Sequence, residues 1–195
     1  MILPGSKTSS LVDTNVWLWQ VYTNAPVSSS HAPDKIRAYT PYLRQARQNG
    51  ATLVYSGLVL AELAHVIEKT EWKIYKQRTG DRLKPKEFRH NKPVERTKVV
   101  EEVESAWMQV QALAVPIDLE VNEETTNAAM ARFRAQALDG YDLLMIEAIG
   151  RAGAGQVKVI TDDSDYATVP GIQVFTNNDI VLQQAPLQGK LLTSR

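Results

Sequence analysis

Short apolar runs alternate with longer amphipathic segments along this chain. Five runs have the length and apolar content of buried strands. They cover residues 9–13, 51–55, 114–117, 157–161 and 172–175. The longer segments repeat apolar residues at helical spacing, and they cover residues 16–19, 35–48, 57–75, 94–112, 122–138 and 142–152. This alternation predicts an α/β fold with three layers, in which helices cover both faces of a central parallel sheet of about five strands.

Turn-forming residues separate these segments. Residues 22–34 and 77–93 are rich in Pro, Gly, Ser or charged residues, so both are expected to connect helices without regular structure of their own. Gly50 is expected to end one helix, and Ser56 is expected to cap the next. A break at 139–140 divides the two late helices, and Gly153 and Gly155 are expected to stop the second of them.

The composition is that of an ordinary globular protein. The chain has 195 residues, 44% hydrophobic and 23% charged, which suits a single domain that buries its own core. We expect that domain over residues 1–182, with a basic insertion at 69–98 and a C-terminal tail at 183–195. Residues 1–19 lack the apolar run of a signal peptide or membrane helix, so a cytoplasmic location is expected.

Two features of the composition limit the chemistry. Cysteine is absent, which excludes disulfides, thiolate zinc sites and cysteine nucleophiles, so any metal must be held by oxygen or imidazole. His31, His65 and His90 lie in a loop, on a helix and in the basic segment, where a catalytic triad is hard to build. The net charge is zero, so any surface that binds nucleic acid must be local.

Two carboxylates follow directly after predicted strands. Asp13 ends the run over 9–13, and Asp163 follows the run over 157–161. Open α/β folds bind their ligands at the carboxyl ends of the strands, so these two side chains are candidates for one shared site. Each of them also fits the ordinary role of a turn or helix-cap residue.

Two further carboxylates fall on the apolar faces of predicted helices. Glu62 lies three residues after Val59 and four before Val66, and Asp142 shares a face with Met145 and other apolar residues. A buried carboxylate needs a metal or a basic partner. The alternatives are a salt bridge for Glu62 and, for Asp142, a place in the first turn of a helix capped by Asp139.

The case for a functional site is stronger when the four carboxylates are considered together. Two at neighbouring strand ends and two at the starts of flanking helices can face one cleft. Clustered carboxylates repel one another, which a hard divalent cation would offset. Oxygen ligands favour Mg²⁺ or Mn²⁺.

Four motifs in order resemble those of the PIN-domain ribonucleases, over about residues 9–176. They are Asp13-Thr14-Asn15-Val16, Glu62 early in a helix, Tyr141-Asp142 before an apolar helix, and Thr161-Asp162-Asp163-Ser164-Asp165-Tyr166. The resemblance extends to the VapC-like toxins of type II toxin–antitoxin systems. It departs from them in a longer segment between the second and third strands, and in Tyr166 where the family usually has Phe.

The resemblance implies a role for each matching residue. Asp13, Glu62, Asp142 and Asp163 would be the catalytic metal ligands. Asp165 would be an additional ligand or a supporting acid. The residues Thr14, Asn15 and Thr161 would shape the site. Asp162 competes with Asp163 for the fourth position; the spacing from Thr161 favours Asp163, and adjacent side chains in extended chain point apart.

The resemblance also implies an activity and partners. The activity is that of a Mg²⁺- or Mn²⁺-dependent endoribonuclease, which hydrolyses RNA phosphodiester bonds. A toxin of this kind would have a small antitoxin partner and would form a homodimer. The alternatives are an RNA-processing PIN nuclease without an antitoxin, or a catalytically inactive PIN module that binds RNA or protein. An aspartyl-nucleophile phosphatase would carry Asp at position 15, where this chain has Asn15.

The segment 69–98 concentrates positive charge. It holds eleven Lys or Arg against four Asp or Glu, and aromatic residues lie among them. Positive charge and flat rings are what single-stranded RNA recognition uses, whereas the plain alternative is a solvated helix and loop. The residues assigned to RNA binding are Lys73, Lys76, Arg78, Arg82, Lys84, Lys86 and Arg89.

Overall fold

The protein is built on a five-stranded sheet in which all strands are parallel. The computed structural model describes residues 9–117, 120–152 and 157–184. The strands are β1 Ser9–Val12, β2 Thr52–Ser56, β3 Val115–Ile117, β4 Val157–Ile160 and β5 Ile172–Phe175, in the order β3-β2-β1-β4-β5. The predicted α/β class, with a five-stranded parallel sheet flanked by helices, is confirmed.

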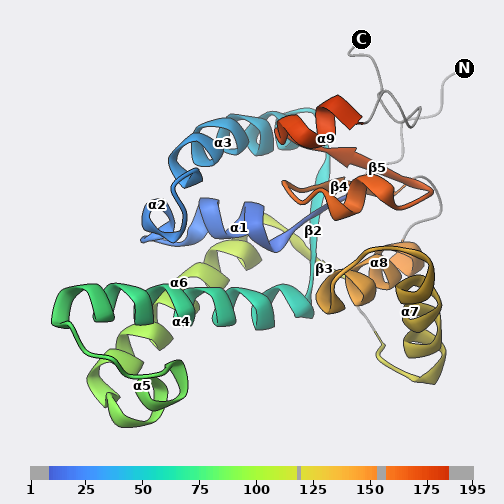
Figure 1. The fold of residues 1–195 in the computed structure, drawn as a ribbon. Coiled ribbons are helices and arrows are strands. Elements are labelled where there is room, and N and C mark those ends of the chain that lie inside the picture. Colours follow the sequence, from blue (N-terminus) through green and yellow to red (C-terminus); the bar gives the residue numbers. More distant parts are fainter. Residues whose placement is uncertain (1–8, 118–119, 153–156, 185–195) are drawn as a thin grey trace, which may run out of the picture.

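Helices lie on both sides of this sheet (Figure 1). They are α1 Thr14–Val21, α2 Ala25–Ser28, α3 Ala32–Gln48, α4 Gly57–Thr79, α5 Pro85–Asn91, α6 Pro93–Leu113, α7 Glu123–Ala135, α8 Gly140–Ala152 and α9 Asp179–Gln184. In Figure 1, α1, α3 and α6 lie to one side of β2, and α7 and α8 lie to the other. Among the described helices, none is long and apolar enough to cross a membrane.

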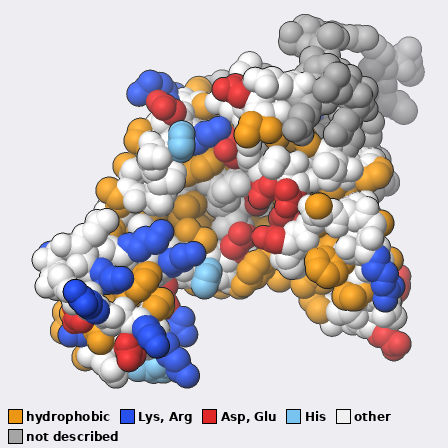
Figure 2. Space-filling model, in the orientation of Figure 1, with side chains coloured by type: hydrophobic (Ala, Val, Ile, Leu, Met, Phe, Trp, Pro, Cys, Tyr) orange, Lys and Arg blue, Asp and Glu red, His pale blue; other side chains and the backbone are white. Residues whose placement is uncertain are grey.

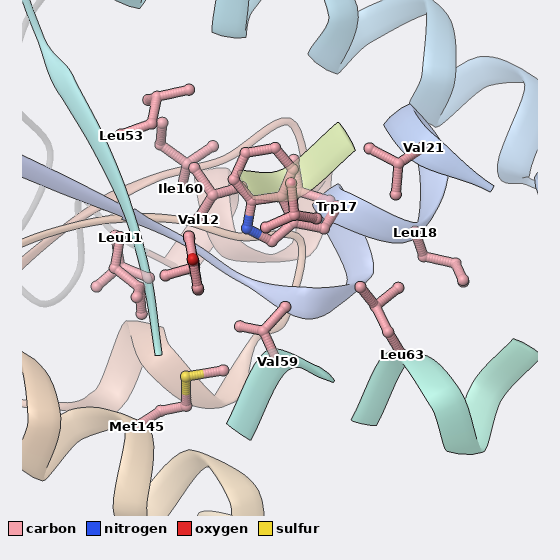
Figure 3. Close-up of a cluster of buried hydrophobic side chains, with 14 of the residues drawn as sticks. Leu11, Val12, Trp17, Leu18, Val21, Leu53, Val59, Leu63, Met145 and Ile160 are labelled. Carbon is pink, nitrogen blue, oxygen red and sulfur yellow. The ribbon is translucent and has the colours of Figure 1, made fainter. Parts of the chain in front are cut away.

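The core lies where the first helix packs on the sheet. Trp17 of α1 is fully buried, and Val12 and Ile160 from the two central strands lie beside it (Figure 3). Leu63 of α4 and Met145 of α8 close the cluster from the helices (Figure 3). Burial of such side chains stabilises the fold by roughly 2 kcal/mol each. The elements that carry the candidate carboxylates are therefore packed on one core.

Local signals place the ends of several helices as the sequence predicts. Ser56 caps α4, because its hydroxyl accepts a hydrogen bond from the Leu58 N–H at 3.2 Å. Gly50 adopts a φ of +81° just after α3, and Gly80 a φ of +71° just after α4, a conformation that glycine takes without strain. Gly153 and Gly155, predicted to stop α8, lie outside the described residues.

The expectation of an irregular connection over residues 77–93 is wrong, because much of this segment is helical. There α4 continues to Thr79, and a further helix, α5, begins at Pro85. Pro inside a helix breaks it, but at the first helical position its missing N–H costs nothing and its fixed φ suits the helix. Part of the expected loop over 22–34 is also helical, as α2, and the short helix α9 reaches into the expected tail.

The far halves of α4 and α6, with α5 between them, form an extension with its own small core. Tyr75, Phe88 and Val99 are buried together there. Beside them the Glu68 carboxylate, 8% exposed, pairs with the guanidinium of Arg89 and, at 3.0 Å, with that of Arg96. These ion pairs join three helices, so they stabilise the shape of the extension.

We expect Glu68→Gln to loosen this extension. The substitution removes the negative partner of Arg89 and Arg96, both about half exposed, so solvent limits the loss in free energy of unfolding to about 1–2 kcal/mol. Faster amide hydrogen exchange in α5, with unchanged exchange in the sheet, is the expected result. A matched Glu101→Gln on the exposed face of α6 should change neither, and equal exchange in both variants would contradict the role of Glu68.

Candidate active site

The first site residue, Asp13, lies at the junction of the two central strands. It follows β1 and caps α1, where its Oδ1 accepts a hydrogen bond from the Thr14 N–H at 2.6 Å. Its Oδ2 accepts one from the Thr161 hydroxyl at 2.5 Å, and its own N–H donates to the Ile160 carbonyl at 3.0 Å. The register, which pairs Val12 with Ile160, brings these two strand ends together. Both oxygens of Asp13 are therefore fixed.

The loop after β4 is a chain of hydrogen bonds that begins at Thr161. The Thr161 hydroxyl accepts from the Asp163 N–H at 2.8 Å while it donates to Asp13. Asp163 Oδ1 in turn accepts from the Asp165 N–H at 2.9 Å, where a 3₁₀ helix, Asp165–Thr168, begins. One threonine thus ties the loop that carries two of the predicted acids to the predicted acid at the end of β1.

Asp162 has a different environment from its neighbour. Its Oδ1 is 2.7 Å from the Lys35 ammonium and accepts a hydrogen bond from the Tyr39 hydroxyl at 2.8 Å. Its backbone N–H donates to Asn15 Oδ1 at 3.4 Å. Asp162 therefore anchors the loop to α3, and Asn15 ties α1 to the same loop. No local pattern around Lys35 and Tyr39 points to this role, because they lie more than a hundred residues away in the chain.

Tyr39 is expected to hold this loop in place. Its hydroxyl lies 3.0 Å from the Thr161 carbonyl and accepts the Asn177 N–H at 2.8 Å. Tyr39→Phe leaves these buried groups unpaired, so we expect a loss of about 1–3 kcal/mol in the free energy of unfolding, measured by urea denaturation. Tyr42→Phe on the same helix is the matched control, and equal stability of the two variants would contradict the role of Tyr39.

Glu62 lies near the start of α4 and is half-buried. No salt bridge to it is found among the described residues, so the predicted alternative of an ion pair is not what holds it there. Burial raises the pKa of Glu62, the carboxylates of Asp139 and Asp163 raise it further, and nearby His65 lowers it.

Asp142 lies in the first turn of α8, as its cap alternative predicts. The capping itself is done by Asp139, whose Oδ1 accepts the N–H groups of Tyr141 at 2.9 Å and Asp142 at 3.1 Å. The Asp142 carboxylate is left free of that task and is 6% exposed. Its burial, with Asp13 and Asp139 nearby, raises its pKa to about 8.

Asp13 shows the same electrostatic pattern. Burial raises its pKa to about 7, and the carboxylates of Glu62 and Asp163 add to the rise, although the hydrogen bond from Thr161 opposes it. The pKa of Asp165 is raised as well, first by burial and then by Asp163. Because these groups act on one another, the structure brings Asp13, Glu62, Asp142, Asp163 and Asp165 into one acidic region.

Two hydroxyls in this region are buried without a hydrogen-bond partner among the described residues, those of Thr14 and Tyr166. They nevertheless lie near enough to Glu62 and Asp142, respectively, to lower the pKa values of those carboxyls. Burial raises the pKa of Tyr166 itself, and its neighbours Asp13 and Asp142 raise it further. Tyr166 therefore adds a polar group to the acidic region.

The acidic region suits a cation by its chemistry more than by its present spacing. Its carboxylates are the ligands that hard divalent cations prefer, and a cation nearby would favour the ionised forms of Asp13 and Asp142, whose pKa values are raised. Within the described part of the chain, however, no three Asp, Glu or His side chains are grouped closely enough to hold a metal ion. The donor set fits a divalent cation, provided that the side chains move closer.

The positive charge of the insertion lies beside this region. Figure 2 shows Asp and Glu side chains gathered near the middle of one face, with Lys and Arg side chains over α4 and α5 at the lower left. Of the residues assigned to RNA binding, Arg78 and Arg89 are engaged in ion pairs with Glu95 and Glu68. No ion pair is found in the described structure for the other five, which are Lys73, Lys76, Arg82, Lys84 and Lys86.

Comparison with known proteins supports the fold. No family model and no curated protein matches this chain. A similar solved structure is the crystal structure of VapBC2 from Rickettsia felis bound to a DNA fragment from their promoter. The similarity has a TM-score of 0.50 and covers 87% of this chain and 98% of that chain, at 16% sequence identity. At this identity it shows a shared fold, which is consistent with the predicted PIN-like architecture.

Proposed function

We propose that this protein is a metal-dependent endoribonuclease of the PIN type. The observation that carries the proposal is the acidic region at the carboxyl ends of the central strands, where Asp13 and Asp142 are buried with raised pKa values. Folds rarely retain buried carboxylates that repel one another unless they serve a function. Asp13, Glu62, Asp142 and Asp163 are the proposed catalytic ligands, with Asp165 as an additional one.

The proposed chemistry is hydrolysis of a phosphodiester bond. A bound Mg²⁺ or Mn²⁺ would supply Lewis-acid polarisation of a phosphoryl oxygen and neutralise negative charge. The chain's own residues would position the carboxylates that bind the cation. The Thr161 hydroxyl fixes Asp13 by a hydrogen bond, and Asp139 caps α8, so that the Asp142 side chain stays free. The contact of Asp162 with Lys35 anchors the loop that carries Asp163, and the Asp163 N–H donates to the same Thr161 hydroxyl.

The biological setting proposed for this activity is a toxin–antitoxin pair. The resemblance of the motifs to VapC-like toxins and the fold shared with a chain of the VapBC2 structure support this assignment. A small antitoxin would restrain the nuclease, and the nuclease would act as a homodimer in the cytoplasm. The domain would cover residues 1–182, with 183–195 as its tail.

The test is cleavage of RNA by purified protein. The protein, freed of any bound inhibitor under denaturing conditions and refolded, is incubated with a structured RNA pool and with Mg²⁺, Mn²⁺ or a chelator. The new ends are then mapped by sequencing. Discrete cuts that require the metal are expected. Binding of RNA with no cleavage in any metal would reject the nuclease and favour the inactive binding module.

A further inference from the structure

One face of α4 carries a row of basic residues that starts at the acidic region. Glu62, His65, Lys69, Lys73 and Lys76 are spaced by three, four, four and three residues, which places them on one side of the helix. His65 is close enough to Glu62 to lower the pKa of that carboxyl. At 1.5 Å per residue, the row runs for roughly 20 Å away from the proposed catalytic site.

The three lysines of this row, Lys69, Lys73 and Lys76, are not neutralised within the described structure, and we call them the lysine row. The acids on the other faces of α4 have other contacts: Glu68 pairs with the arginines of the extension, and Glu71 accepts hydrogen bonds from Tyr22 and Asn24. The structure gives no ion pair for any member of the lysine row. Its positive charge is available to a ligand.

Lys69 and Lys73 do not serve the helix itself, whereas Lys76 lies in its last turn, where a cation is favoured, and against the Trp72 ring. Lys69 and Lys73 are four residues apart, and Lys73 and Lys76 three, spacings at which like charges destabilise a helix by about 0.2–0.5 kcal/mol per pair. Elsewhere in the extension, by contrast, basic residues form ion pairs that join helices. Lys69 and Lys73 thus bring a cost to the helix and form no ion pair in the described structure, which indicates a role in binding.

An aromatic ring stands at the outer end of the row. The Lys76 ammonium lies 4.6 Å from the centroid of the Trp72 ring, and the Trp72 Nε1–H donates to the Leu83 carbonyl at 2.8 Å, which fixes the ring. Figure 2 shows Lys and Arg side chains continuing from the central acidic side chains toward α5. Positive charge in line with a fixed ring is the arrangement by which proteins hold single-stranded nucleic acid.

We propose that the lysine row guides the phosphate backbone of a single-stranded RNA segment into the catalytic site. The inference rests on the proposed nuclease function and adds the form of its substrate. One row of charges along one helix matches one phosphate chain, whereas a duplex presents two backbones across a groove. His65 lies where that segment would pass from Lys69 to Glu62.

The test measures RNA binding by a Lys69→Gln/Lys73→Gln/Lys76→Gln triple variant. Gln has nearly the helix propensity of Lys, so the fold is retained, which an unchanged melting temperature verifies. Both this variant and the parent carry Asp13→Asn to prevent cleavage. With single-stranded RNA, the triple variant should bind roughly tenfold or more weakly, and its salt slope should fall by about two, from three lost phosphate contacts.

The matched control removes the same charge from another helix. It is Arg37→Gln/Arg44→Gln/Arg47→Gln, three exposed residues of α3 that are not assigned to RNA binding. It should bind single-stranded RNA within about twofold of the parent. The proposal would be overturned if both triple variants lost the same affinity for single-stranded RNA, or if the row variant lost none. It would also be overturned if the row variant lost as much affinity for duplex RNA as for single-stranded RNA. Equally strong, row-dependent binding of polyglutamate would also overturn it, in favour of an acidic protein partner.

Cleavage separates this proposal from the nuclease assignment. On the wild-type background, the row variant should cut a minimal substrate too short to reach Lys69 at the parental rate, and should cut long single-stranded RNA more slowly. If the parent cuts neither substrate, the nuclease assignment fails while the binding data still decide the role of the row. If the row variant cuts both substrates at the parental rate, the role of the row fails while the nuclease assignment stands.

Discussion

Asp13→Asn is expected to reduce RNA cleavage by about 10³-fold or more. Asp13 is buried at the centre of the acidic region, and both of its oxygens are positioned by hydrogen bonds, from Thr14 and Thr161. An amide binds a hard cation far less well than a carboxylate, so the charge stabilisation lost in the transition state amounts to several kcal/mol. The measurement is the rate of cut formation at the mapped sites with saturating Mg²⁺ or Mn²⁺.

Asp34→Asn is the matched control for this experiment. Asp34 lies at the start of α3 with its side chain 77% exposed, so its loss should leave the cleavage rate unchanged. Circular dichroism of both variants establishes that the fold is retained. Cleavage by Asp13→Asn at more than a tenth of the wild-type rate would remove Asp13 from the catalytic set.

The position of the acidic region could be predicted from the sequence because strand ends are a local signal. Asp13 and Asp163 follow short apolar runs, and parallel strands place their carboxyl ends at one edge of the sheet. Glu62 and Asp142 could be predicted because they interrupt apolar faces. In each case a few neighbouring residues decide the structure, and the structure does bring the four side chains into one region.

The contacts that position the site could not be predicted, because they join distant segments. Lys35 and Tyr39 reach Asp162 across 127 and 123 residues. Nothing in the pattern around Lys35 distinguishes it from a solvated surface lysine. The same holds for Glu68, whose two arginine partners are brought to it by α5 and α6. Helix α5 itself was missed because Pro85 has opposite meanings inside a helix and at its first residue.

The raised pKa values also predict how the metal-free protein responds to pH. The ordinary pKa of an Asp is 3.8, and the folded protein raises that of Asp13 to about 7 and that of Asp142 to about 8. Between these limits the unfolded chain releases protons that the folded protein retains, so the free energy of unfolding must fall as the pH rises. We expect a loss on the order of several kcal/mol from pH 4 to pH 8, measured by urea denaturation with chelator present.

Asp142→Asn separates this effect from the general titration of the chain. The amide keeps the size of the side chain without its charge, so the loss of stability between pH 4 and pH 8 should be smaller in the variant. The exposed Asp34→Asn should keep the wild-type pH dependence of stability.

Saturating Mn²⁺ at pH 8 should restore stability to the wild-type protein and restore less in Asp142→Asn, since a cation stabilises the fold only through the carboxylates that hold it. An equal restoration in both proteins would place the cation elsewhere, and an unchanged pH dependence in Asp142→Asn would mean that this carboxyl is not the strained group.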